Sequence, residues 1–189
     1  MRWTYLLAGT IGVVLSLWMG WGIYLITTTA HPPYEVVRHL SSDVEIRQYQ
    51  DQTWISAAHT SDDASFMVLA SYIFGGNKQE QQVAMMAPVI TDGKMSFILP
   101  VGLTPELAPT PEGHAIDFNS VRARTLATIQ FSWRTTPERV EAKTEALLDR
   151  LAANGIQTQG RPFLMRYNDP WTPPFLRRNE VAIEVISSD

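Results

Sequence analysis

The sequence contains no cysteine among its 189 residues. Disulfide bonds, thiolate metal sites and cysteine nucleophiles are therefore excluded. Its histidines are scattered singly, without the close spacing of a zinc site, at His31, His39, His59 and His114. Neither a Gly-x-Ser-x-Gly elbow nor a glycine-rich phosphate loop is present. Because none of these standard catalytic parts occurs, we predict that the chain is not an enzyme.

Basic residues are also fewer than acidic residues. The chain has 15 basic and 19 acidic residues, for a formal net charge of −4. The basic residues form no cluster along the sequence, so we predict no nucleic-acid partner.

Charged residues are absent from Trp3 to Ala30. The apolar run from Tyr5 to Ile26 is long enough to cross a bilayer as a helix, which needs about 20 residues. A signal peptide is the alternative, because Thr28-Thr29-Ala30 resembles a cleavage site, although the apolar region of a signal peptide is typically only about 7–15 residues long. On length we favour an uncleaved anchor over residues 1–30, followed by one domain over residues 31–189. The positive charge of Arg2 favours a cytoplasmic N-terminus and an extracytoplasmic domain; cleavage would instead leave a secreted or periplasmic protein.

The first part of the domain has the pattern strands, helix, hairpin. Alternating apolar residues predict strands, and Ser61 followed by two aspartates predicts the start of a helix that ends at Gly75-Gly76-Asn77. Asp92-Gly93 is typical of a hairpin turn. The predicted strands are Tyr34–Leu40, Val44–Tyr49, Thr53–Thr60, Ala87–Thr91 and Lys94–Pro100.

The second part repeats that order. Two strands are predicted between residues 114 and 133, and Thr136-Pro137-Glu138 begins a helix that Asn154-Gly155 ends. The last strands are Pro162–Tyr167 and Asn179–Val185. This duplication predicts an α+β fold: one antiparallel sheet, curled toward a barrel, with two helices against it.

Several side chains are candidates for a flat apolar ligand or for its metal. The first helix presents Phe66, Ala70 and Ile73 on one face, although core packing explains that face most simply. Methionine suits either an irregular core or an apolar ligand, and Met85-Met86 precedes a strand. Because heme iron accepts histidine, methionine or tyrosine, the candidate axial ligands are His59, Met85, Met86 and Tyr167.

The segment "RYNDPWTPPFLRRNEV" (Arg166–Val181) connects the last two strands. Its three prolines fix the backbone and hold Trp171 and Phe175 in preset positions. Two interpretations carry equal weight. In one, the loop plugs the barrel: the aromatics cap the core, and the arginines Arg177 and Arg178 pair with Asp169, Glu180 or a neighbour. In the other, it forms a ligand rim, in which the aromatics stack on a flat ring and an arginine binds a carboxylate.

Four blocks in order resemble the SOUL/heme-binding protein family, from about Tyr34 to Val185. They are "VEIRQY", "SFMVLASYIFGGN", Met85 with Ala87-Pro88-Val89, and "RYNDPWTPPFLRRNEV", the last in its plant and bacterial form. The resemblance implies a twofold-repeated distorted antiparallel β-barrel flanked by two helices, here preceded by a transmembrane helix. It also implies non-covalent binding of heme or a related tetrapyrrole beside the first helix. Gln48 stands where some animal members carry a histidine ligand, and Trp133 where glycine is usual.

We therefore expect a membrane-anchored tetrapyrrole carrier or buffer with heme as its cofactor. The expected heme-binding residues are Phe66, Ala70, Ile73, Met85, Met86, Trp171 and Arg177. The alternative, favoured by Gln48, is a module on the same scaffold that binds another hydrophobic ligand or a protein without iron chemistry.

Overall fold

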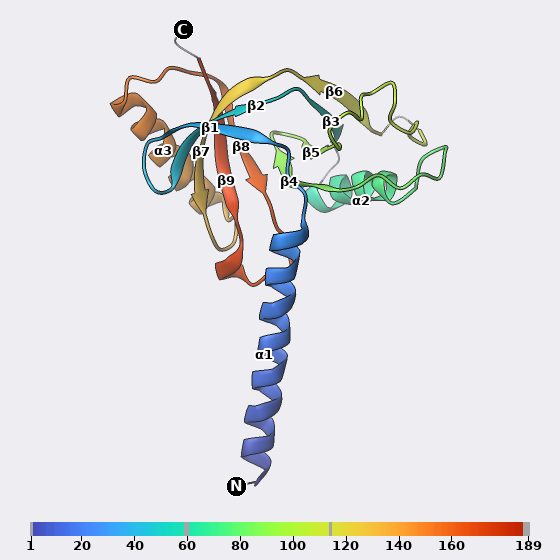
Figure 1. The fold of residues 1–189 in the computed structure, drawn as a ribbon, viewed down its shortest axis with the longest axis vertical. Coiled ribbons are helices and arrows are strands. Elements are labelled where there is room, and N and C mark those ends of the chain that lie inside the picture. The colour runs from blue at the N-terminus through green and yellow to red at the C-terminus, as the bar shows by residue number, and fades with distance from the viewer. Residues whose placement is uncertain (1, 59–60, 114, 187–189) are drawn as a thin grey trace.

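The structure is a computed structural model that describes residues 2–58, 61–113 and 115–186. One long helix, α1 (Arg2–Thr28), projects from a body of strands and two further helices (Figure 1). The chain then continues directly into the body, where the backbone N–H of Ala87 donates to the carbonyl of Ala30 at 2.9 Å. The base of α1 is thus joined to the sheet.

Nine strands form one antiparallel sheet in the order β1-β2-β7-β9-β8-β4-β5-β3-β6. Most of the strands expected from the sequence are present, and Val44–Tyr49 and Asn179–Val185 match to the residue. Their bounds are β1 Tyr34–His39, β2 Val44–Tyr49, β3 Gln52–Ala57, β4 Met86–Thr91, β5 Met95–Ile98, β6 Asp117–Val121, β7 Arg124–Phe131, β8 Thr158–Arg166 and β9 Asn179–Val185.

The expectation of a barrel is wrong, because the sheet does not close. Its end strands, β1 and β6, are each paired on one side only among the described residues. The sheet does curl: the guanidinium of Arg124 on β7 lies over the ring of Trp54 on β3, 4.9 Å from its centroid, although four strands separate β7 from β3 in the pairing order. Curvature therefore brings the two halves together without hydrogen-bonding their edges.

The strand order is symmetric about the β8–β4 pair, as the sequence duplication predicts. Reading outward from it, β9, β7 and β2 on one side match β5, β3 and β6 on the other. The halves exchange their first strands, since β2 pairs with β7 of the second half and β6 pairs with β3 of the first. This exchange interlocks the two repeats into one domain.

Each half carries one helix, α2 (Asp62–Ile73) or α3 (Pro137–Ala153). Ser61 caps α2 by accepting from the Ala64 N–H at 3.2 Å, and Thr136 caps α3 by accepting from Arg139 at 3.4 Å. Leu69 packs α2 into one buried cluster with Phe97, and Leu147 packs α3 into another with Ile129. A third cluster, around Met165, fills the middle of the sheet. A short 3-10 turn, η1 (Pro174–Leu176), lies between β8 and β9.

Candidate functional site

The outward side of α2 is unusually apolar for a surface helix. Met67 and Phe74 are 66% and 70% exposed and stand seven residues apart, so they lie on one side of the helix axis. Phe66 is also partly exposed, and its ring meets Phe97 edge to face at 5.4 Å. We call Phe66, Met67, Phe74 and the exposed Met85 the α2 surface.

The chain turns back after the helix, and Met85 lies on the returning segment. The N–H of Val83 donates to the carbonyl of Ile73 at 2.8 Å, and Gln82 forms an antiparallel bridge with Phe74. In Figure 1 the segment after α2 returns along the helix to β4. Ala70 and Ile73, also expected to bind the ligand, are buried on the side of α2 that faces the sheet.

The candidate axial ligands do not meet at one place. Met86 is buried in the central cluster, and the hydroxyl of Tyr167, also buried, donates to Glu180 at 2.8 Å. Among the candidates that the structure describes, only the thioether of Met85 is exposed. His59 lies outside the described residues.

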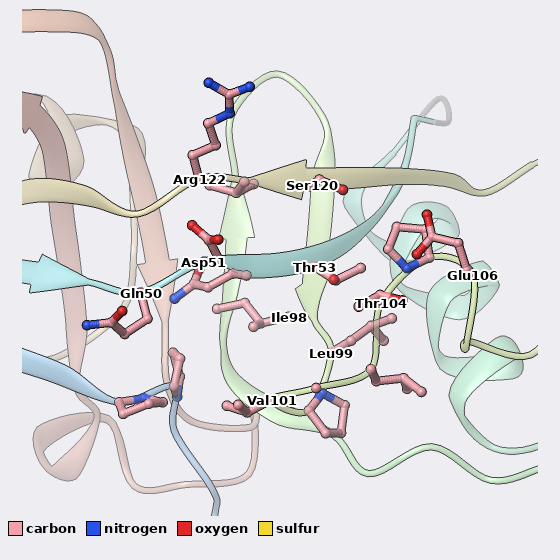
Figure 2. A pocket seen from close by; sticks show the side chains of 18 residues that line it. Gln50, Asp51, Thr53, Ile98, Leu99, Val101, Thr104, Glu106, Ser120 and Arg122 are labelled. Carbon is pink, nitrogen blue, oxygen red and sulfur yellow. The ribbon is translucent and has the colours of Figure 1, made fainter.

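A cleft of about 550 Å³ opens elsewhere, where the chain crosses between the two halves (Figure 2). Its walls are residues 32–33, 50–53, 98–106 and 120–122. Figure 2 shows Ile98, Leu99 and Thr53 around the cavity, while the guanidinium of Arg122 points away from it. Asp51 is held by accepting the N–H of Ala123 at 2.6 Å.

The cleft is chemically different from the α2 surface. Four prolines and several aliphatic side chains line it, but no histidine, methionine, tyrosine or cysteine does. Its volume lies within the roughly 300–1,000 Å³ of small-molecule pockets. None of the residues expected to bind a ligand is among its walls, and the sequence offered no periodic signal for it because connections supply most of the lining.

A buried charge network lies between β2 and β9. The carboxylate of Glu180, fully buried, accepts two hydrogen bonds from the guanidinium of Arg47, at 2.7 and 3.0 Å. Arg178 donates to the same carboxylate at 2.7 Å, and its guanidinium lies 4.1 Å from the ring centroid of Tyr167. The guanidinium of Arg47 lies in turn over the ring of Tyr34.

The contacts within the network shift the pKa values of Glu180 and Tyr167. Burial raises the pKa of Glu180, but hydrogen bonds and attraction from Arg47 and Arg178 outweigh burial and leave that pKa below its ordinary value. Burial together with the nearby Glu180 carboxylate raises the pKa of Tyr167 well above its usual range. Tyr167 is therefore a neutral hydrogen-bond donor in a structural network.

The loop between β8 and β9 is folded on itself. Asp169 accepts from the N–H groups of Trp171 and Thr172 at 2.6 and 3.0 Å. Arg177 donates to the carbonyls of Thr172 and Pro170 at 2.8 and 2.5 Å. The arginine contacts fit the closure interpretation, since Arg178 pairs with Glu180 and Arg177 binds the loop backbone. Its other part does not hold, because Trp171 and Phe175 are exposed and do not cap the core.

That loop also lies against α1 (Figure 1). The indole N–H of Trp18 donates to the carbonyl of Trp171 at 2.7 Å. One turn further along, a Cβ on Gly22 would come within 2.8 Å of Pro173 Cδ, so glycine permits the close approach. Trp171 and Arg177 are thus on the α1 side of the molecule, separate from the α2 surface.

The scan against protein families finds a match to the SOUL heme-binding protein over residues 29–184. The chain belongs to the SOUL family. The SOUL family is a family of heme-binding proteins and is not typically enzymatic. Heme is therefore the candidate cofactor. The resemblance carried by the four sequence blocks is confirmed. No curated relative matches the chain.

Solved structures resemble this SOUL chain in fold at low sequence identity. The C-terminal domain of EcmrR is 13% identical with a TM-score of 0.53, over 82% of this chain and 98% of that one. EcmrR in its complex with DNA is 11% identical with a TM-score of 0.54, over 75% of this chain and 56% of that one. The chain therefore spans little more than half the length of that protein. An uncharacterized conserved protein from Listeria innocua is 10% identical with a TM-score of 0.48, over 84% of this chain and 93% of that one. The two likenesses to EcmrR concern the fold alone.

Proposed function

We propose that this SOUL protein is a membrane-anchored tetrapyrrole-binding protein that carries or buffers its ligand, with the macrocycle lying on the α2 surface. The observation that carries the proposal is an exposed apolar helix face, with thioether groups, in a family that binds heme. Burial of a flat apolar ring against such side chains supplies most of the affinity at sites of this kind.

Support for the anchor comes from α1 and from its junction with the body. Residues Thr10–Thr28 are apolar and long enough to cross a membrane, and almost none of that span is buried. Cleavage after Ala30 would remove the carbonyl that accepts the Ala87 N–H. Retention of α1 keeps this hydrogen bond, with the N-terminus cytoplasmic and the domain on the far side.

The α2 surface fits a flat macrocycle. Phe66 and Phe74 offer ring faces and edges, while the flexible side chains of Met67 and Met85 adapt to its shape. When bound, heme supplies an iron that accepts a thioether or imidazole ligand. This chain's residues shield the ring from water, and Met85 is the described candidate whose sulfur can reach that surface.

Hemin titration tests the site. The full chain in detergent micelles is titrated with hemin, with empty micelles subtracted, and the Soret band is followed. Met85→Gln removes an exposed thioether and makes a half-exposed position polar, which costs about 1 kcal/mol and weakens binding about fivefold.

Leu148→Gln is the matched control, because Leu148 on α3 is 37% exposed and Met85 is 38% exposed. It is expected to leave hemin affinity unchanged. Equal affinities for the wild type and both variants would contradict the α2 site, and no saturable Soret change at micromolar hemin would contradict heme binding itself.

The cleft favours a second candidate, which is binding of a hydrophobic ligand without iron chemistry. No residue on its walls is a customary iron ligand, and its lining is mostly apolar. Metal-free protoporphyrin is the probe, with fluorescence as the readout. Val101→Glu places a charge at an exposed wall position, so cleft binding predicts a loss with this variant and none with Met85→Gln.

A further inference from the structure

Three exposed aromatic side chains gather where the body meets α1. Trp171 is 78% exposed, Trp133 is 55% exposed and Phe175 is 47% exposed. Trp133 and Phe175 have ring centroids 6.5 Å apart, and the N–H of Trp133 donates to the carbonyl of Pro174 at 2.8 Å. We call Trp133, Trp171 and Phe175 the aromatic rim.

The backbone at one residue of the rim, Trp133, is strained. Trp133 has a φ of 76°, a backbone conformation that favours glycine and costs a bulky residue on the order of 1 kcal/mol or more. Its carbonyl accepts from the side chain of Asn179 at 2.9 Å. A large indole is therefore fixed in a strained position while more than half of it faces outward, which core packing does not explain.

Position along α1 indicates what the rim meets. Trp18, which donates to the Trp171 carbonyl, precedes Ile26 by a little over two turns, or about 12 Å along the axis. If the bilayer core lay wholly on the N-terminal side of Trp18, only the uncharged stretch 3–17 between Arg2 and Trp18 could cross it, and that stretch is too short for a span of about 20 residues. Any bilayer that α1 crosses must therefore reach the level of the rim.

We propose that the aromatic rim inserts into the interfacial layer of the membrane that α1 crosses, so that the domain is seated on the lipid instead of swinging from a single helix. Tryptophan suits this layer because its ring is apolar and its N–H is polar. The two charged side chains Asp169 and Arg177 already have partners within the loop: Asp169 accepts backbone N–H groups and Arg177 donates to carbonyls, which lowers the cost of moving them out of water.

The inference rests on the proposed anchor, and labelling of the full chain separates the two. Because the chain has no cysteine, single-cysteine variants carry one nitroxide label each. Phe175→Cys reports on the rim, Ile11→Cys on α1, and Ile186→Cys is the matched control, since Phe175 and Ile186 are both 47% exposed. Ile186 directly follows β9, which ends at the side of the body away from α1 (Figure 1).

Each variant is reconstituted in phosphatidylcholine vesicles, and relaxation by oxygen, which concentrates in lipid, is compared with relaxation by a water-soluble nickel chelate. We expect labels 11 and 175 to favour oxygen and label 186 to favour nickel. Label 175 in water with label 11 in lipid would overturn the rim and keep the anchor. Label 11 in water would overturn both. Label 175 shielded from both reagents would mean that protein, such as a second copy, covers the rim, and would also overturn it.

A second variant tests the docking of the loop on α1. Gly22→Leu is expected to push Pro173 away from the helix, because even a Cβ there would approach it to 2.8 Å. Combined with Phe175→Cys, it should reduce the oxygen preference of label 175 severalfold while label 11 stays in lipid. An unchanged preference would contradict the role of the contact with α1.

Discussion

The two halves of the domain share a scaffold and differ in what their helices show to the outside. In the first half, α2 exposes Met67 and Phe74. In the second, the outer side of α3 is charged, and Arg150 and Lys143 form ion pairs with Asp43. Only Leu148 among the large apolar side chains of α3 is more than a third exposed. Both halves thus share the same arrangement of strands and helix, but only the helix of the first half exposes an apolar surface suited to a ligand.

The inner sides of the two half-sheets differ as well. In the first half, the buried hydroxyls of Ser56 and Ser96 lie 2.7 Å apart, and Asn119 donates to Ser56 at 3.0 Å. In the second half, the corresponding region holds the carboxylate of Glu180 between two arginines. The first half therefore depends on neutral hydrogen bonds and the second on buried charge, whose loss is far more costly.

Removal of the buried carboxylate is the largest expected perturbation. Glu180→Gln keeps the side-chain shape but leaves the guanidinium of Arg178 without its counter-charge and that of Arg47 with Glu45 alone, which costs about 3–5 kcal/mol of unfolding free energy. Chemical denaturation measures it. Ser96→Ala, the control from the other half, should cost about 1 kcal/mol, and equal losses would contradict the contrast between the halves.

The same network predicts a pH dependence. Because the pKa of folded Glu180 lies below 4.5, its stabilising charge is fully present above pH 4.5 and is lost as the pH falls through the lowered value. The gap in unfolding free energy between wild type and Glu180→Gln should be constant near neutral pH and narrow in acid. A gap that widens toward low pH would show that the carboxylate is not ionised in the fold.

Truncation beneath each helix should reveal where the halves are alike. Leu69 under α2 and Leu147 under α3 are both fully buried, and replacing either with alanine should cost about 3 kcal/mol. Thermal unfolding of the two variants measures this. A loss at one position only would mean that the helices do not contribute equally to the core.

The smallest effect is expected at the helix caps. Ser61→Ala and Thr136→Ala each remove one side-chain acceptor from a first turn and should cost about 1 kcal/mol. Helix α3 also has proline at its first position, which favours its start independently of the cap. We therefore expect the loss at Ser61 to be the larger, as read from unfolding midpoints.

Local patterns predicted the elements of this fold well. The alternation in Val44–Tyr49 reflects a strand with one face on a core, and Asp92-Gly93 does form the turn between β4 and β5, with Gly93 at a φ of 66°. The sheet's failure to close was not predictable in this way. Closure depends on whether the end strands β1 and β6 pair with each other, and pairing between distant strands leaves no mark in local periodicity.

The site was less predictable for the same reason. Phe66 and Met85 were named from residue type and family resemblance, and both are exposed near α2. Arg47 and Glu180, however, are 133 residues apart, and neither strand pattern says which partner it meets. Arg47 stands on the face of Val44–Tyr49 opposite Val44 and Ile46, which the alternation predicts to be exposed, so the sequence carried no signal for its burial.

Hydrogen exchange on the full chain with and without hemin tests the central claim most directly, because it compares both halves in one experiment. We expect hemin to slow amide exchange in α2 and in the segment that precedes β4, and to leave α3 unchanged. Slower exchange in α3 instead, or in residues 98–106 of the cleft with none in α2, would contradict the assignment of the ligand surface to the first half.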